Sequence, residues 1–146
     1  MDKTKAALKV VLADSFVMYF KTHSYHWNVE GSNFGEMHEF FSGIYTDLHA
    51  ITDVWAEQIR TLDEYAPVSL MEMYNYKTIS EDTSKPATCD QMLVNTMMAN
   101  NVMITNLDLL FTVATEENIQ NIADTAAARL DVHRKLAWML KSYLKA

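Results

Sequence analysis

Apolar side chains recur along the chain at spacings of three and four residues, the period that places them on one face of an α-helix. The turn residues Gly31 and Asn33 follow the first stripe, so we expect the first helix to end near Asn28. A second stripe predicts a helix from Asn33 to about Leu62, opened by a capping box of Asn33 and Glu36. The first stripe is formed by Leu8, Leu12, Phe16, Tyr19, His23 and His26.

The stretch of residues 63–86 has a weaker apolar pattern, although so long a connection without structure of its own is uncommon in a compact domain. Pro67 suits the first position of a helix, so we expect residues 68–74 to form two helical turns. Thr88 and Gln91 form a second pair of the capping type, which opens a third long helix.

A last apolar stripe extends to Leu144 and predicts a fourth long helix. We expect Thr115 to cap its start, because Glu116 and Glu117 follow where a helix N-terminus favours negative charge. Together the elements predict an all-α fold: an antiparallel four-helix bundle with a crossover and a short helix between the second and third long helices, in a single domain of residues 1–146. Four asparagines of the third helix are expected to face solvent or a polar cavity wall: Asn95, Asn100, Asn101 and Asn106.

Composition excludes several other classes of protein. The 146 residues include only 3 Gly and 2 Pro, too few for the frequent turns of an all-β sandwich or barrel. No apolar run reaches the roughly 18 residues of a membrane span and no signal peptide opens the chain, so no membrane association is expected. The single cysteine, Cys89, excludes an intrachain disulfide and indicates a cytoplasmic setting. The formal net charge of −7 argues against affinity for nucleic acid.

Two histidines and two carboxylates share one broad face of the first two predicted helices. Asp53 and Glu57 lie one turn apart, and the 15 residues from His38 to Asp53 return within about 60° of the same direction. His38 and Asp53 are about 22 Å apart along the helix axis. One metal ion could therefore touch both kinds of ligand only if a second copy of the helix packed antiparallel against the first. A two-fold dimer would place the histidines of one chain, His26 and His38, beside the carboxylates of the other. Such mixed ligands suit iron, manganese or zinc.

Three segments carry a resemblance to a known family. Residues 22–34 (THSYHWNVEGSNF), Met37-His38 and residues 53–57 (DVWAE) resemble the signature of the Dps family, the mini-ferritins of the ferritin-like superfamily. The likeness extends to HRKLAWMLK at 133–141 and so covers nearly the whole chain. It implies a hollow homododecamer of two-fold dimers. Such a shell takes up ferrous iron, oxidises it at dimer-interface sites with hydrogen peroxide in preference to dioxygen, and stores ferric mineral.

The resemblance assigns the iron-ligand and catalytic roles to four residues: His26, His38, Asp53 and Glu57. It places Trp27 beside the site. Ser42 departs from the pattern, because the family usually has Asp four residues after the second histidine and a hydroxyl is a poorer ligand than a carboxylate. His23, one turn before His26, could supply a substitute nitrogen, and His49 could act around the ligands.

Other interpretations of these residues stay open. His26, His23 and His49 could be packed structural histidines, and Glu57 could form an ordinary surface pair with Arg60. The impaired second iron position leaves a non-catalytic ferritin-like shell as the main alternative function. A DNA-coating shell is the other, although the chain opens with only two lysines in its first five residues and no basic tail, so DNA binding is not expected.

Two further functions are excluded by spacing. Conventional ferritins place Glu-x-x-His motifs inside each bundle, and no Glu in this sequence has His three residues later. His38 and Glu39 begin like a zincin motif, but Ser42 stands where its second histidine would be. Spacing therefore argues against a protease and a conventional ferritin, and the resemblance to the Dps family implies an iron-oxidising shell.

Overall fold

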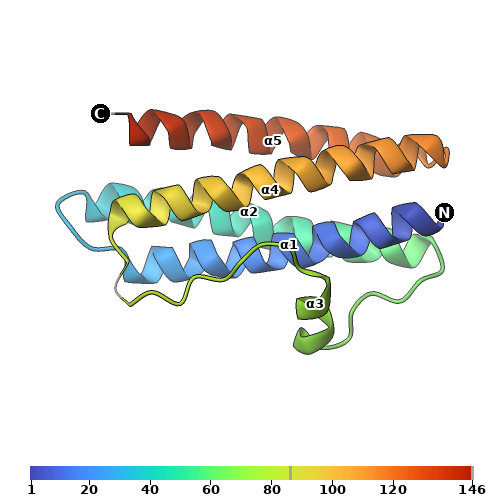
Figure 1. The fold of residues 1–146 in the computed structure, drawn as a ribbon, viewed down its shortest axis with the longest axis horizontal. Coiled ribbons are helices and arrows are strands. Elements are labelled where there is room, and N and C mark those ends of the chain that lie inside the picture. Colours follow the sequence, from blue (N-terminus) through green and yellow to red (C-terminus); the bar gives the residue numbers. More distant parts are fainter. Residues whose placement is uncertain (86, 146) are drawn as a thin grey trace.

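The computed structural model describes residues 1–85 and 87–145, which form five α-helices and no strand. The helices are α1 (Asp2–Asn28), α2 (Phe34–Thr61), α3 (Leu70–Tyr76), α4 (Cys89–Glu116) and α5 (Gln120–Leu144). In Figure 1, α1 and α2 form one antiparallel hairpin and α4 and α5 a second, while the crossover between α2 and α4 carries α3 and runs back along the bundle. The predicted all-α bundle with a crossover is confirmed. Within the described ranges, no helix is both long and apolar enough to cross a membrane.

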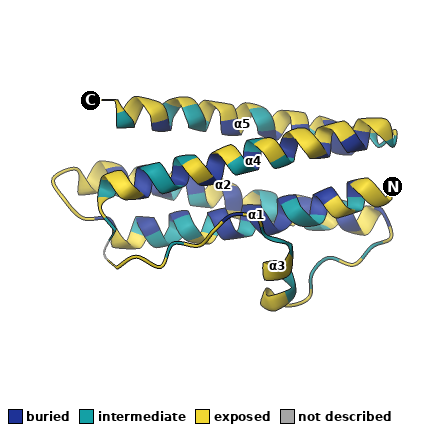
Figure 2. Cartoon of the chain, viewed as in Figure 1, coloured by how far each residue is buried: buried dark blue, intermediate teal, exposed yellow. Residues whose placement is uncertain are grey.

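The long helices bury one apolar core along their facing sides (Figure 2). Trp55 and Phe41 of α2 are fully buried in it, together with Leu8 and Met18 of α1 and Leu107 of α4. Each side chain of this size contributes about 1.5–3 kcal/mol through removal from water. This packing holds α1 against α2 and so sets the register at which the histidines of the two helices meet.

One of the two predicted capping pairs forms. Thr88 Oγ1 accepts a hydrogen bond from the Gln91 backbone N–H at 3.1 Å, which confirms the predicted start of α4. The capping box predicted for α2 is wrong. The Asn33 amide instead donates to the sulfur of Cys89 at 3.9 Å, and the Glu36 carboxylate accepts from the Tyr143 hydroxyl at 3.0 Å.

The short helix begins later than predicted. Ser69 caps α3 by accepting a hydrogen bond from the Glu72 backbone N–H at 3.1 Å, so the helix starts at Leu70. The expectation of a helix over 68–74 with Pro67 at its first position is therefore wrong by a few residues, because a serine side chain can accept from the first helical turn and proline cannot.

The predicted cap of the last helix is also wrong. Thr115 lies inside α4, where its hydroxyl donates to the Phe111 carbonyl, and the chain turns at Asn118, which has a φ of 61°. Glu117 caps a different helix: its carboxylate accepts from the backbone N–H of Thr4 at 2.8 Å and from the Thr4 hydroxyl at 2.6 Å. These bonds, together with the N-terminal ammonium 3.0 Å from the carboxylate, lower the pKa of Glu117 to about 2. The acid predicted at the start of α5 thus stabilises the start of α1.

Two carboxylates, the buried Asp14 and the half-buried Asp82, fasten the crossover to α1 and α4. Asp14 of α1 is fully buried and accepts from the backbone N–H groups of Thr78 at 2.6 Å and Ile79 at 2.9 Å, and from the Asn106 amide at 2.7 Å. Further along, Asp82 accepts from the Tyr25 hydroxyl at 2.6 Å.

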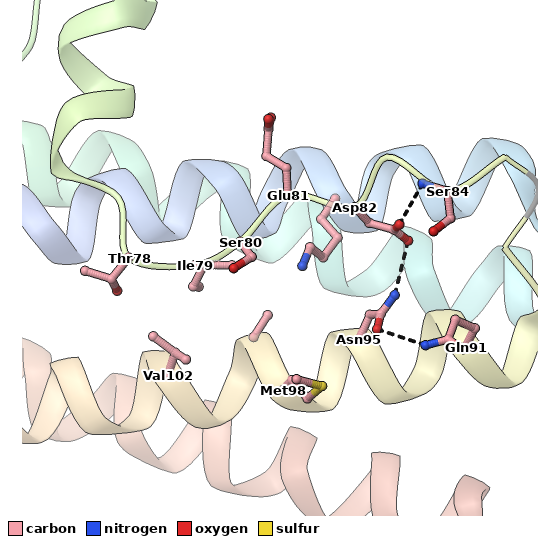
Figure 3. A pocket seen from close by; sticks show the side chains of 12 residues that line it. Thr78, Ile79, Ser80, Glu81, Asp82, Ser84, Gln91, Asn95, Met98 and Val102 are labelled. Atoms are coloured by element: carbon pink, nitrogen blue, oxygen red, sulfur yellow. Dashed lines mark hydrogen bonds between the residues drawn. The ribbon is translucent and has the colours of Figure 1, made fainter.

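A polar pocket of about 370 Å³ remains between the crossover and α4 (Figure 3). Asn95 lies at its edge, as expected of a residue on a polar cavity wall, and donates to Asp82 at 3.1 Å. Its lining comes from the crossover, α4 and Lys21, none of which the sequence predicted to bind metal.

Candidate metal centre

The imidazoles of His26 and His38 face each other where α1 ends and α2 begins. Their ring centroids are 3.7 Å apart and their planes differ by 17°. Nδ1 of His26 lies 2.7 Å from the carbonyl oxygen of His38, and Nδ1 of His38 lies 2.7 Å from the carbonyl oxygen of His26. Because a carbonyl oxygen only accepts, each Nδ1 carries a hydrogen, and Nε2 is the nitrogen of each ring that is left to bind a metal ion.

The loop between the two helices makes this pairing possible. Val29 ends α1 with its N–H bonded to the Tyr25 carbonyl, and Gly31 has a φ of 121°, a conformation that side chains rarely allow. The reversal brings α2 back alongside α1. Phe34 then packs on the outer face of His38, with ring centroids 5.0 Å apart. His38 is therefore held between an aromatic ring and the imidazole of His26.

The two carboxylates lie further along α2. Asp53 and Glu57 are both exposed and lie one turn apart. In the described part of the chain, no group of three or more histidine, cysteine or acidic side chains is placed to hold a metal ion. One protomer therefore brings the two histidines together but does not bring them to the carboxylates.

The surface ion pair considered for Glu57 is not present among the described residues. The Arg60 guanidinium donates to the carbonyl of Glu64 at 3.0 Å and lies over the Tyr65 ring, 4.6 Å from its centroid. The carboxylate of Glu57 thus stays open to solvent or to another molecule.

An aromatic cluster of Tyr19, His23, Trp27 and Tyr45 adjoins the histidine pair. The His23 ring stacks on Tyr45, with centroids 3.8 Å apart and an interplanar angle of 5°, and lies 4.2 Å from the Trp27 ring. Nδ1 of His23 is 3.1 Å from the Tyr19 hydroxyl. Burial, and then the neighbouring imidazoles of His26 and His49, lower the pKa of His23. His23 is therefore packed among aromatic rings, with its centroid 6.0 Å from that of His26.

Ser42 and His49 occupy α2 beyond His38. Ser42 is half-buried one turn after His38, and His49 is exposed, with its ring centroid 5.0 Å from that of Tyr19. Neither completes a three-ligand group with the histidine pair within the described residues. The local arrangement places His49 beside the aromatic cluster rather than beside the two facing imidazoles.

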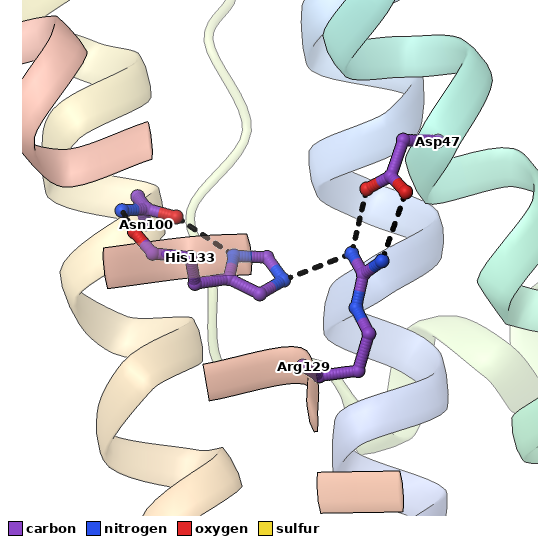
Figure 4. Close-up of polar contacts among 4 residues, drawn as sticks. All are labelled: Asp47, Asn100, Arg129 and His133. Atoms are coloured by element: carbon purple, nitrogen blue, oxygen red, sulfur yellow. Dashed lines mark hydrogen bonds and ion pairs between the residues drawn. The ribbon is translucent and has the colours of Figure 1, made fainter. Parts of the chain in front are cut away.

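A polar network away from the histidine pair was not predicted from the sequence (Figure 4); Arg129, His133 and Asn100 are buried in it, and Asp47 is exposed. Arg129 of α5 donates to both oxygens of Asp47 on α2, at 2.9 and 2.8 Å, and its Nη2 lies 3.1 Å from Nε2 of His133. Nδ1 of His133 lies 2.7 Å from the side-chain oxygen of Asn100, which is buried, so the expectation that Asn100 faces solvent or a polar cavity is wrong. Burial, and then the Arg129 charge, lower the pKa of His133 to about 3. The spacing of Arg129 and His133, one turn apart on an apolar stripe, was the available signal.

Comparison with known proteins places the chain in a family. The family model of the ferritin-like domain, Ferritin, matches residues 5–146. An uncharacterized low temperature-induced protein of Nostoc is 32% identical over 136 residues, which are 92% of this chain and 75% of that protein. The DNA protection during starvation protein of Helicobacter pylori is 27% identical over 142 residues, which are 97% of this chain and 99% of that protein.

Two solved structures superpose on almost the whole length of this chain. Dps from Thermosynechococcus elongatus superposes with a TM-score of 0.96 at 25% identity, covering 99% of this chain and 92% of that one. A Dps protein from Vibrio cholerae, described as a member of a broad superfamily of ferritin-like diiron-carboxylate proteins, superposes with a TM-score of 0.93 at 28% identity, covering 99% and 90%. With the family model, the relatives and the fold in agreement, the chain belongs to the Dps family of ferritin-like proteins.

Proposed function

We propose that the protein is an iron-storing mini-ferritin that oxidises ferrous iron at sites between two subunits and keeps the ferric product inside a shell. The proposal rests on the facing pair of His26 and His38. Nδ1 of each ring bonds to the backbone carbonyl oxygen of the other residue, which leaves the two Nε2 atoms as ligands. The description of the Vibrio cholerae relative as one of the diiron-carboxylate proteins supports iron as the metal.

The remaining ligands would come from a second chain. An isologous two-fold contact between α2 helices places the histidines of one protomer beside Asp53 and Glu57 of the partner subunit, and it creates two equivalent sites. Both carboxylates are exposed on one protomer, as this contact requires. Glu57 would bridge towards a second iron position. Imidazole and carboxylate donors together accept both ferrous and ferric ions.

Hydrogen peroxide, or dioxygen, would take the electrons. Each ferrous ion gives up one electron, and two such electrons break the O–O bond of one peroxide and yield two hydroxide ions. The ferric ions then hydrolyse and collect as mineral within a homododecamer built from the two-fold dimers. Iron and peroxide are removed together, so less hydroxyl radical forms near other molecules of the cell.

The shared site can be tested by complementation between two inactive chains. One chain carries His26→Ala and His38→Ala, and the other carries Asp53→Asn and Glu57→Gln. Alone, each should lose the rapid growth of ferric absorbance that follows ferrous salt and peroxide. Co-assembled in equal amounts, half of the dimers are mixed and each mixed dimer has one intact site, so about a quarter of the native activity should return.

Two results bear on the proposal directly. Glu39→Gln, which removes an exposed carboxylate from the same helix but outside the proposed site, should leave iron oxidation at the native rate. If the mixed assembly stays inactive while each chain folds and assembles, the ligands do not come from two subunits and the proposed centre is wrong.

The half-buried hydroxyl of Ser42 favours one second candidate, a non-catalytic ferritin-like shell. In that case the chain binds ferrous ions at His26 and His38 but does not oxidise them faster than solution does. Anaerobic titration of ferrous ions, followed by peroxide in the same sample, separates the two functions. Binding without accelerated oxidation supports the shell, and binding with acceleration supports the ferroxidase.

A further inference from the structure

The aromatic cluster offers a continuous path of ring contacts to the proposed iron ligands. The Tyr19 hydroxyl is 3.1 Å from Nδ1 of His23, and the His23 ring stacks on Tyr45 at 3.8 Å. The Tyr45 centroid is in turn 5.2 Å from that of His26. A phenol with a nitrogen base at its hydroxyl therefore lies one hydrogen bond and two ring contacts away from a proposed metal ligand.

Electron counting shows why a route for electrons to the iron ligands matters. A ferrous ion supplies one electron, whereas reduction of peroxide to hydroxide consumes two. Two imidazoles and two carboxylates are enough protein ligands for one ion, and the hydroxyl of Ser42 is a weak donor for a second. When a single ferrous ion meets peroxide, the second electron has to come from the protein, or a hydroxyl radical is released.

We propose that Tyr19 supplies this second electron while His23 accepts the phenolic proton; the inference rests on the proposed function. The O–O bond breaks and both oxygens leave as hydroxide. The ferrous ion loses one electron to become ferric, and Tyr19 loses one electron to become a neutral tyrosyl radical as its proton moves to Nδ1 of His23. The charge gained by iron and by His23 balances the two hydroxides.

A later ferrous ion restores the pair. It gives one electron to the tyrosyl radical and becomes ferric, and the proton returns from His23 to the phenolic oxygen. The full cycle still consumes two ferrous ions for each peroxide, but it needs only one of them at the site when peroxide arrives. A site with a single well-built iron position can in this way reduce peroxide completely.

The structure favours Tyr19 over the other members of the cluster. Oxidation of a neutral phenol is much easier when its proton can leave at the same time, and among the hydrogen bonds of the described residues Tyr19 is the cluster member whose hydroxyl meets a nitrogen base. The Tyr45 ring stacks on His23 and also contacts the His26 ring, so it connects the two imidazoles. His23 is thus a positioning and proton-accepting residue, and Tyr19 is the electron donor.

The test is rapid freeze-quench electron paramagnetic resonance of the assembled protein, loaded anaerobically with one ferrous ion per chain and mixed with hydrogen peroxide. We expect a tyrosyl radical whose signal narrows when the protein is made with ring-deuterated tyrosine. Tyr19→Phe, which removes only the hydroxyl, should abolish the signal and raise the yield of a spin-trapped hydroxyl radical in solution. His23→Gln should lower the radical yield without lowering the number of ferrous ions bound.

Tyr65→Phe is the matched control, because Tyr65 is 75% exposed on the crossover and lies outside the cluster; its radical yield should equal the native one. A native radical yield in Tyr19→Phe overturns the inference. Iron oxidation by the native protein without any tyrosyl radical also overturns it, yet leaves the proposed function standing. Failure to bind ferrous ions or to accelerate their oxidation overturns the proposed function itself.

Discussion

Removing the carboxylate of Asp14 should loosen the crossover and with it the fold. Asp14 is fully buried on α1, and its oxygens accept hydrogen bonds from the Thr78 N–H, the Thr78 hydroxyl, the Ile79 N–H and the Asn106 amide. Ile79 is 2% exposed, so its N–H would have no access to water once the acceptor is gone. We therefore predict that Asp14→Ala is one of the most destabilising single changes outside the apolar core.

The magnitude follows from these four donors. A buried donor left without a partner costs about 1–3 kcal/mol, which applies to Ile79 N–H. The other donors lie on residues that water can reach, and each loses about 0.5–1.5 kcal/mol of net hydrogen bonding. Relief of the carboxylate's own burial offsets part of the sum, so Asp14→Ala should lower the free energy of unfolding by about 3 kcal/mol.

Two milder variants make the reasoning testable in steps. Asp14→Asn keeps one oxygen for the backbone N–H groups but turns an acceptor into a donor facing the Asn106 amide, so it should cost about 2 kcal/mol. Asn106→Ala removes the amide's two hydrogen bonds, to Asp14 and to the Thr78 hydroxyl, and should cost about 1–2 kcal/mol. Asp131→Ala, an exposed acid of α5, should change stability by less than about 0.5 kcal/mol.

The measurement is urea unfolding followed by far-ultraviolet circular dichroism with linear extrapolation. All variants must be compared at one protein concentration, because self-association contributes to apparent stability. If Asp14→Ala and Asp131→Ala unfold at the same urea concentration, the crossover is not held by this carboxylate and the reasoning is refuted.

Three further outcomes are expected. The pKa of His133 is about 3 in the folded protein against 6.5 as its ordinary value, so its contribution to stability is complete above pH 6.5 and is lost as the pH falls towards 3. Between pH 6 and 4.5 the native protein should lose about 1.4 kcal/mol per pH unit more than His133→Gln, measured by urea unfolding at each pH; equal slopes would contradict this. Glu117→Gln should speed amide hydrogen exchange in the first turn of α1, because Thr4 loses a charged acceptor, while the first turn of α4 should be unaffected. The net charge of −7 predicts no retention of duplex DNA in a gel-shift assay at low salt and neutral pH, and strong retention would show that the charge argument fails.

Helix placement could be predicted from the sequence because the bonds and apolar stripes of a helix link residues three or four apart. The end of α1 at Asn28 and the start of α4 after Thr88 were predicted from such local signals. The same short range explains the errors. Thr115 looked like a helix start, but the preceding helix continues through it, because nothing local stops α4 before the turn at Asn118.

Candidate metal residues could likewise be named from their type and spacing, but not their geometry. That His26 and His38 would stack and bond to each other's carbonyl oxygens depends on how tightly the loop at Gly31 reverses the chain. No periodicity in the sequence indicates which nitrogen of an imidazole is left for a metal. That choice is made by the acceptor the other nitrogen meets.

The partners of polar side chains were decided by tertiary structure alone. Glu117 caps a helix through Thr4, 113 residues away in sequence, and Asn100 is buried because His133 of a neighbouring helix offers it both a donor and an acceptor. The amino-acid sequence determines by itself where helices form and which side chains are chemically able to bind iron. Packing between helices determines which of those groups meet, because a hydrogen bond forms only where two chain segments come within about 3 Å, whatever their separation in sequence.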